Sequence, residues 1–196
     1  MESNTADAFY EISTLMTSDT SALLVVDVQE KLLPHIFEHE EVTRRCVQTI
    51  EVAGHLGLPI LVTEQYVKGL GPTVGPVREA LERFDAYKPL EKFAFSCFGD
   101  EAFEDRFDEK EISTLVVVGI ESHVCVMQTA LDALDRDTNV YLIAEATGSR
   151  NPRHKDEALQ RMRDQGAIIG SVEMFAFEAM RTAKHDKFKH VQKVIL

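Results

Sequence analysis

Short apolar segments alternate with amphipathic segments along most of the chain. Runs rich in Val, Ile and Leu predict strands buried on both faces at residues 22–28, 59–63, 113–120, 140–144 and 167–171. Apolar residues at helical spacing predict helices at residues 42–56, 100–110, 124–135, 154–164 and 172–183. This alternation predicts an α/β fold: a three-layer, doubly wound, Rossmann-like domain with a mainly parallel sheet of about six strands.

Four segments fall outside this pattern. Residues 1–20 are polar and rich in Ser and Thr, and we expect an N-terminal arm there, followed by one domain over residues 21–196. Gly69–Pro76 is rich in Gly and Pro, which predicts a loop. Glu91–Phe98 is rich in aromatic residues, and we expect it to have no regular structure. Val191–Leu196 is apolar enough to form an interface.

Two reactive side chains are predicted to meet at one edge of the sheet. In open α/β sheets ligands bind outside the carboxyl ends of the strands. Asp27 lies near the end of the first strand, and Cys125 opens the helix after the third. The N–H groups at a helix N-terminus lower a thiol pKa from about 8.5 and can stabilise an oxyanion. Cys125 is therefore a candidate nucleophile.

Each candidate also has a structural interpretation. A single cysteine is often a small buried apolar residue; Cys46, on the apolar face of a helix, is of that type, and Cys97 is ambiguous. Asp27 alone could cap a helix, bind a loop or hold Mg²⁺. Lys92 lies among Phe93, Phe95 and Phe98, where its stem could pack on rings with the ammonium in water.

Three segments in this order resemble a known family. Leu24–Gln29, Lys92–Phe98 and Gly119–Val126 are similar to the acid-bearing strand, the lysine loop and the nucleophile loop of the isochorismatase-like cysteine hydrolases. That family includes nicotinamidases and N-carbamoylsarcosine amidase. The resemblance covers residues 21 to 183 or so, and Glu64–Thr73 is similar to the isochorismatase-domain subgroup of bacteria and animals.

The resemblance implies a role for each residue of the predicted site. Cys125 would be the nucleophile, Asp27 would take its proton and later activate water, and Lys92 would stabilise negative charge. A cis peptide bond would join Ile120 and Glu121. The backbone N–H groups of Glu121 and Cys125 would form the oxyanion hole.

The implied reaction is cysteine-dependent hydrolysis of a small amide, or of a related compound, through a thioester. We expect further side chains to line the substrate pocket: Gln29, Gln65, Tyr66, Phe95 and Ser122. No cofactor is expected. The segment from Thr63 to Thr73 contains no histidine, so the metal cluster of nicotinamidases is not expected. Two alternatives stay open: a vinyl-ether hydrolase of the isochorismatase type that uses Asp27 as an acid, and a non-catalytic binding protein.

Composition and charge limit the classes of partner. The net charge of −12 disfavours nucleic acid, since the phosphate backbone would be repelled. No apolar run approaches the roughly 20 residues of a membrane span. Three cysteines and no secretory signal favour a reducing, cytoplasmic compartment. The expected partner is a small-molecule substrate, and the resemblance implies a homo-oligomer.

Overall fold

The computed structural model describes residues 15–196. They build one sheet of six parallel strands in the order β3-β2-β1-β4-β5-β6. The strands are β1 (Ser21–Val26), β2 (Ile60–Gln65), β3 (Leu90–Lys92), β4 (Thr114–Ile120), β5 (Asn139–Gly148) and β6 (Ile168–Gly170). The predicted α/β fold with about six strands is confirmed.

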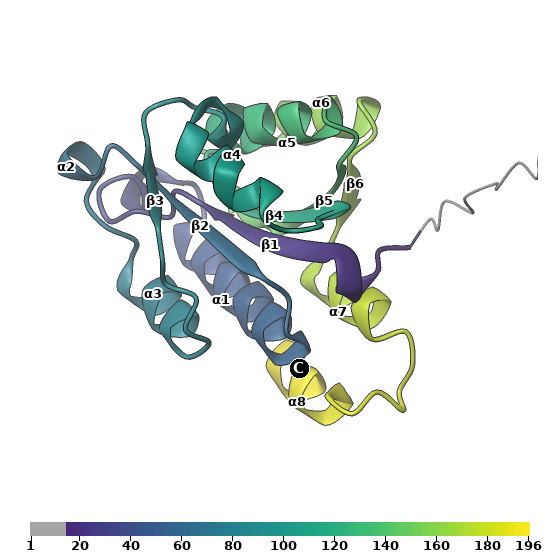
Figure 1. Ribbon diagram of the computed structural model, residues 1–196. Helices are drawn as coiled ribbons and strands as arrows, with labels where there is room; N and C mark the ends of the chain where they lie inside the picture. The colour runs from purple at the N-terminus through teal and green to yellow at the C-terminus, as the bar shows by residue number, and fades with distance from the viewer. Residues whose placement is uncertain (1–14) are drawn as a thin grey trace, which may run out of the picture.

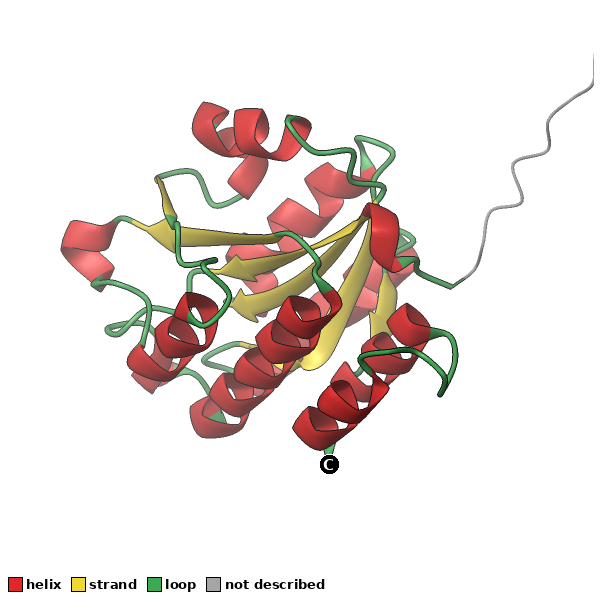
Figure 2. Ribbon diagram, turned by 60° about the horizontal axis from the view of Figure 1, so that its bottom comes forward, coloured by secondary structure: helices red, strands yellow, loops and turns green. Residues whose placement is uncertain are grey.

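Helices cover both faces of the sheet (Figures 1 and 2). One face carries α1 (His39–Leu56), α3 (Gly75–Glu82), α7 (Val172–Met180) and α8 (Phe188–Ile195). The other carries α4 (Glu101–Asp108), α5 (Met127–Leu134) and α6 (Pro152–Asp164). The short α2 (Val67–Leu70) follows β2 at the sheet edge, and single turns lie at η1 (Ser18–Thr20), η2 (Leu33–His35), η3 (Cys97–Gly99) and η4 (Ser122–Val126).

The central strand β1 shows why an unbroken apolar run is needed. All six of its residues are buried. Leu23 and Val25 pack into the core beneath α1 and α7, whereas Leu24 and Val26 pack into the core beneath α4 and α5. Successive side chains of a strand point to opposite faces, so a strand covered on both faces needs apolar residues at every position.

The strand order reverses between β1 and β4, which lie side by side. A crevice forms outside the carboxyl ends of the strands at such a reversal. Gly119 of β4 lies beside Val26 of β1 and has φ +118°. A Cβ at Gly119 would lie 2.1 Å from the Val26 carbonyl oxygen, so only glycine permits this approach. The residues after both strands are thereby brought together.

Four regular elements of the structure were not predicted from the sequence, and α2 and α8 are two of them. Helix α3 begins at Gly75, inside the segment predicted as a loop, with Pro76 in its first turn, where a helix tolerates proline. Strand β3 begins at Leu90, just before the segment predicted as irregular, and ends at Lys92.

The two ends of the described chain pack on the domain itself. Met16 is buried, and Arg181 donates hydrogen bonds to the carbonyls of Leu15 and Met16. Most of the predicted arm, residues 1–14, lies outside the described residues. Val191 of α8 is fully buried against the chain's own core, so this part of the predicted interface segment 191–196 is already covered. Among residues 15–196, no helix is long and apolar enough to cross a membrane.

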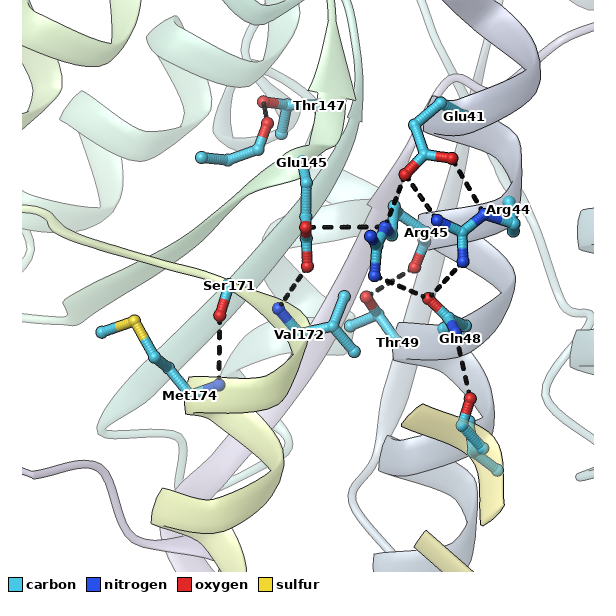
Figure 3. Close-up of polar contacts among 12 residues, drawn as sticks. Glu41, Arg44, Arg45, Gln48, Thr49, Glu145, Thr147, Ser171, Val172 and Met174 are labelled. Atoms are coloured by element: carbon cyan, nitrogen blue, oxygen red, sulfur yellow. Dashed lines mark hydrogen bonds and ion pairs between the residues drawn. The ribbon is translucent and has the colours of Figure 1, made fainter. Parts of the chain in front are cut away.

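A polar network ties α1 to β5, α7 and α8 (Figure 3). Glu145 of β5 accepts a hydrogen bond from the Val172 N–H at the start of α7 (2.9 Å) and lies 3.5 Å from Arg45 of α1. Gln48 of α1 donates to the Val194 carbonyl of α8 (3.0 Å). One face of the sheet is thereby held by hydrogen bonds as well as by apolar packing.

Candidate active site

Asp27 and Lys92 form a buried ion pair at the carboxyl edge of the sheet. Asp27 follows β1 with φ 50°, Lys92 ends β3, and their side chains are 0% and 1% exposed. Oδ2 of Asp27 lies 2.7 Å from Nζ of Lys92. Oδ1 accepts a 2.8 Å hydrogen bond from the Thr63 hydroxyl of β2. Burying either charge alone would be costly, so the two side chains stabilise each other's charge.

The Lys92 ammonium has three further acceptors. Its Nζ lies 2.7 Å from Oε1 of Gln65, 3.1 Å from the carbonyl oxygen of Phe95 and 3.2 Å from that of Ala94. Burial by itself would lower the pKa of Lys92, but the charge of Asp27 and the nearby thiols raise it on balance. Lys92 is therefore a fixed positive charge rather than a proton donor.

Cys125 lies in the π-helical turn η4 that leads into α5. Such turns often occur at functional sites. Its side chain is almost buried, with 6% exposed. Burial, and then the negative charge of Asp27, raise the pKa of Cys125 to about 12, although Lys92 acts in the opposite direction. The prediction of a lowered pKa for the Cys125 thiol was wrong, because burial and the nearby Asp27 carboxylate outweigh the effect of the Lys92 cation.

The loop that carries Cys125 begins with a cis peptide bond between Ile120 and Glu121. The Glu121 carboxylate is buried and is held by Arg150 from the β5–α6 loop. Its Oε2 accepts from the Arg150 backbone N–H (2.9 Å), and the Arg150 Nε lies 3.1 Å from both carboxylate oxygens. Arg150 therefore fixes the start of the loop that carries Cys125 through the Glu121 side chain.

Two buried polar side-chain atoms in residues 15–196 lack a hydrogen-bond partner: Oδ2 of Asp27 and Oγ of Ser122. Asp27 Oδ2 lies 2.7 Å from the Lys92 ammonium, its ion-pair partner. Unsatisfied buried polar atoms are rare in folded proteins and require an explanation. Both atoms belong to the predicted site, and Ser122 Oγ is available to a substrate.

The other predicted pocket residues divide into two groups. Gln29 is fully buried, and its amide nitrogen donates to the carbonyls of Gln65 (2.9 Å) and Gly71 (2.6 Å), while its Oε1 accepts from the Gln65 N–H (2.7 Å). Gln29 thus fixes the loop after β2. Tyr66 and Phe95 expose their rings beside the site, and the Tyr66 ring lies 5.8 Å from that of Phe93.

Two residues near Asp27 were missed as site residues. Thr63 lies on β2 and Cys97 on η3, and each lies more than 30 positions from Asp27 in the sequence. No local pattern marks them, since their relation to Asp27 depends on the strand register. Histidine, cysteine and acidic side chains form no group of three or more with metal-binding geometry in residues 15–196.

The chain is similar to known proteins over nearly its whole length. It matches the isochorismatase domain over residues 21–174. Isochorismatase domain-containing protein 2 of Xenopus laevis is 36% identical over 177 residues, covering 90% of this chain and 84% of the relative. A Caenorhabditis elegans structure described as MAR1 ribonuclease has a TM-score of 0.85 and 36% identity, and 92% of each chain is covered.

Two YcaC structures share the fold at lower identity. YcaC from Pseudomonas aeruginosa, solved with hexane-2,5-diol and covalent acrylamide, has a TM-score of 0.86 and 23% identity over 94% of this chain and 93% of its own. YcaC from Escherichia coli, described as an octameric hydrolase of unknown specificity, has a TM-score of 0.86 and 22% identity over 93% of this chain and 89% of its own.

Proposed function

Since the chain belongs to the isochorismatase family of hydrolases, we propose that it cleaves a small amide by cysteine catalysis. Cys125 is the nucleophile, Asp27 the general base and acid, and Lys92 the fixed cation. The observation that carries the proposal is the buried carboxylate of Asp27. Its Oδ2 lies 2.7 Å from the Lys92 ammonium, and its negative charge acts on the Cys125 thiol.

The first half of the reaction forms a thioester. Cys125 is protonated at neutral pH because its pKa is about 12. As the sulfur attacks the amide carbonyl, the thiol proton moves to Oδ2 of Asp27. The oxygen of the tetrahedral intermediate accepts hydrogen bonds from the N–H groups of Glu121 and Cys125. The C–N bond then breaks, and Asp27 returns the proton to the departing amine.

The second half releases the acid. Water attacks the thioester carbonyl while Asp27 takes one of its protons. The tetrahedral intermediate collapses, the C–S bond breaks, and Asp27 protonates the Cys125 sulfur. The Lys92 ammonium, which three further acceptors hold in place, stays beside the Asp27 carboxylate throughout. The small exposed area of Cys125 favours a small substrate.

Turnover of a panel of small aliphatic and aromatic amides, followed by ammonia release, tests the proposal. We expect Cys125→Ala and Asp27→Asn to abolish turnover of any active amide, whereas Cys46→Ala, whose thiol lies in the core beneath α1, retains it. The same variants assayed on isochorismate separate the vinyl-ether alternative, which needs Asp27 but tolerates Cys125→Ala. Turnover of an amide by Cys125→Ala would refute the proposal.

The proposals on assembly, partners and location rest on a structural neighbour, the net charge and the free cysteines rather than on site geometry. The octameric structure of E. coli YcaC supports a homo-oligomer. We do not propose an RNA substrate from the C. elegans description, because the net charge of −12 would repel the phosphate backbone. A cytoplasmic location stays a prediction, with which the three free cysteines agree.

A further inference from the structure

Asp27 has a second polar contact that the proposed reaction does not use. Its Oδ1 accepts a 2.8 Å hydrogen bond from the hydroxyl of Thr63, and the Thr63 side chain is as buried as the carboxylate. Val26, which precedes Asp27, lies beside Thr63 in the parallel register of β1 and β2. The sheet itself therefore holds the hydroxyl against one oxygen of the carboxylate.

Cys97 contacts the same hydroxyl. The Cys97 sulfur lies 3.8 Å from Thr63 Oγ1, at hydrogen-bond distance for sulfur, and its backbone N–H donates to Thr129 Oγ1 of α5 (2.9 Å). Burial, and then the charge of Asp27, raise the pKa of Cys97 to about 12, so the thiol keeps its proton at neutral pH. The S–H group can donate to Thr63, whose own proton is then directed to Asp27.

The two oxygens of Asp27 therefore have different surroundings. Oδ1 accepts a hydrogen bond from the Thr63 hydroxyl, whereas Oδ2 lies 2.7 Å from the Lys92 ammonium. The ionisable groups that act on the carboxylate are Lys92 from β3, Cys97 from η3 and Cys125 from η4. A hydroxyl donor stabilises the charged form of a carboxylate and lowers its affinity for a proton.

We propose that Thr63 is a positioning residue for the general base: its hydroxyl occupies Oδ1 of Asp27, so that Oδ2 is the oxygen that exchanges protons with Cys125. This inference rests on the proposed function of Asp27 and Cys125. The hydrogen bond from Thr63 fixes the orientation of the carboxylate. Cys97 supports Thr63 and does not take part in the reaction.

The test measures how fast acrylamide adds to Cys125 as a function of pH, with peptide mass spectrometry to distinguish the three cysteines. In this addition the sulfur bonds to the terminal carbon, the thiol proton passes to Asp27, and Asp27 returns it to the carbon beside the carbonyl. Protonation of Asp27 stops the reaction. The rate therefore falls at acid pH, and the midpoint of that fall follows the ionisation of the base.

We expect Thr63→Val to move this midpoint upward by about one pH unit, which is the effect of removing one hydrogen bond to a charged group. Thr63→Ser should keep the wild-type midpoint. Thr129→Val is the matched control. It makes the same change in a buried threonine that contacts Cys97 and for which no hydrogen bond to Asp27 is seen, so the midpoint should not move. Thr63→Ala, which also lacks the hydroxyl, carries the same expectation as Thr63→Val.

An unshifted midpoint in Thr63→Val or Thr63→Ala would overturn the positioning role, even if the rate fell, because a purely structural role lowers the rate at every pH. Equal shifts in Thr63→Val and Thr129→Val would overturn it too. Failure of the proposed function looks different: the wild-type protein would then add acrylamide to Cys125 no faster than to the other two thiols.

Discussion

Asp27 and Lys92 are the residues on which the site's electrostatics depend most. Both side chains are buried, and Oδ2 lies 2.7 Å from Nζ. A buried ion pair is not strong evidence for net stability, because desolvation offsets the attraction. The loss of one partner is a different matter, since the remaining charge stays buried without compensation.

Lys92→Met should accordingly destabilise the protein by about 3–5 kcal/mol, as measured by urea unfolding. The variant leaves Asp27 buried without its cation, although Thr63 still donates to it. The double variant Asp27→Asn with Lys92→Met removes both charges, and we expect it to be more stable than Lys92→Met alone. If the loss of unfolding free energy in the double variant equalled the sum of the losses in the two single variants, the two side chains would act independently.

Some residues of the site were easier to predict from the sequence than others. Asp27 and Cys125 follow strongly apolar strands, so their meeting at the sheet edge could be predicted from pattern and fold. Lys92 ends a strand of three residues that contains two charges, too short and polar to be recognised. Its assignment came from family resemblance. Thr63 and Gln29 act through contacts with residues 36 positions away, which only the register of β1 and β2 creates.

At the scale of elements, the first residue of α7 depends on a side chain from β5. Glu145 accepts a hydrogen bond from the Val172 N–H, and Ser171 accepts one from the Met174 N–H (3.2 Å). The first N–H groups of a helix have no partner inside the helix, and side-chain acceptors satisfy them. Glu145 therefore links the helix start to the sheet, and its ion pair with Arg45 extends the link to α1 (Figure 3).

Glu145→Ala should lower the free energy of unfolding by about 1–2 kcal/mol, mainly through the lost cap. Glu145→Gln keeps an acceptor for Val172 and should lose less. Glu82→Ala is the surface control, because its pair with Arg78 is exposed and contributes less than about 1 kcal/mol. Urea unfolding measures all three. If Glu145→Ala and Glu82→Ala lost equal stability, the capping role would be rejected.

Element boundaries also show where the sequence analysis failed. The central strands β1 and β4 were found because burial on both faces requires an unbroken apolar run. Helix α3 was missed because Gly75 and Pro76 were taken as loop residues, although proline is common in a first helical turn. Most of the π-helical turn η4 was predicted as part of an α-helix. In a segment of five residues the pattern of apolar residues does not distinguish a π-helix from an α-helix.

For the molecule as a whole, three buried thiols affect stability at alkaline pH. Burial raises the pKa of Cys46, Cys97 and Cys125 to about 12, whereas an unfolded thiol ionises near about 8.5. Between these values the unfolded chain binds fewer protons than the folded one. Stability from the neutral thiols is therefore complete below about pH 8.5 and is lost as the pH rises towards 12.

The free energy of unfolding should fall steadily between pH 8.5 and pH 11 or so, as measured by urea unfolding at several pH values. Cys46→Ala removes the thiol farthest from the site, so its curve should fall less steeply than that of the wild type, whatever its stability at neutral pH. Parallel curves for the two proteins would contradict the raised pKa of Cys46.

The most direct test of the central claim is the rate at which acrylamide adds to each cysteine in the wild-type protein and in Asp27→Asn. A thiol with a pKa of about 12 is ionised to only about one part in 10⁵ at pH 7, so an unassisted Cys125 would react very slowly. If Asp27 takes the proton, wild-type Cys125 reacts before Cys46 and Cys97 at a rate that levels off above acid pH. In Asp27→Asn the rate is far lower and rises about tenfold with each pH unit. Equal rates for Cys125 in the two proteins would contradict the account.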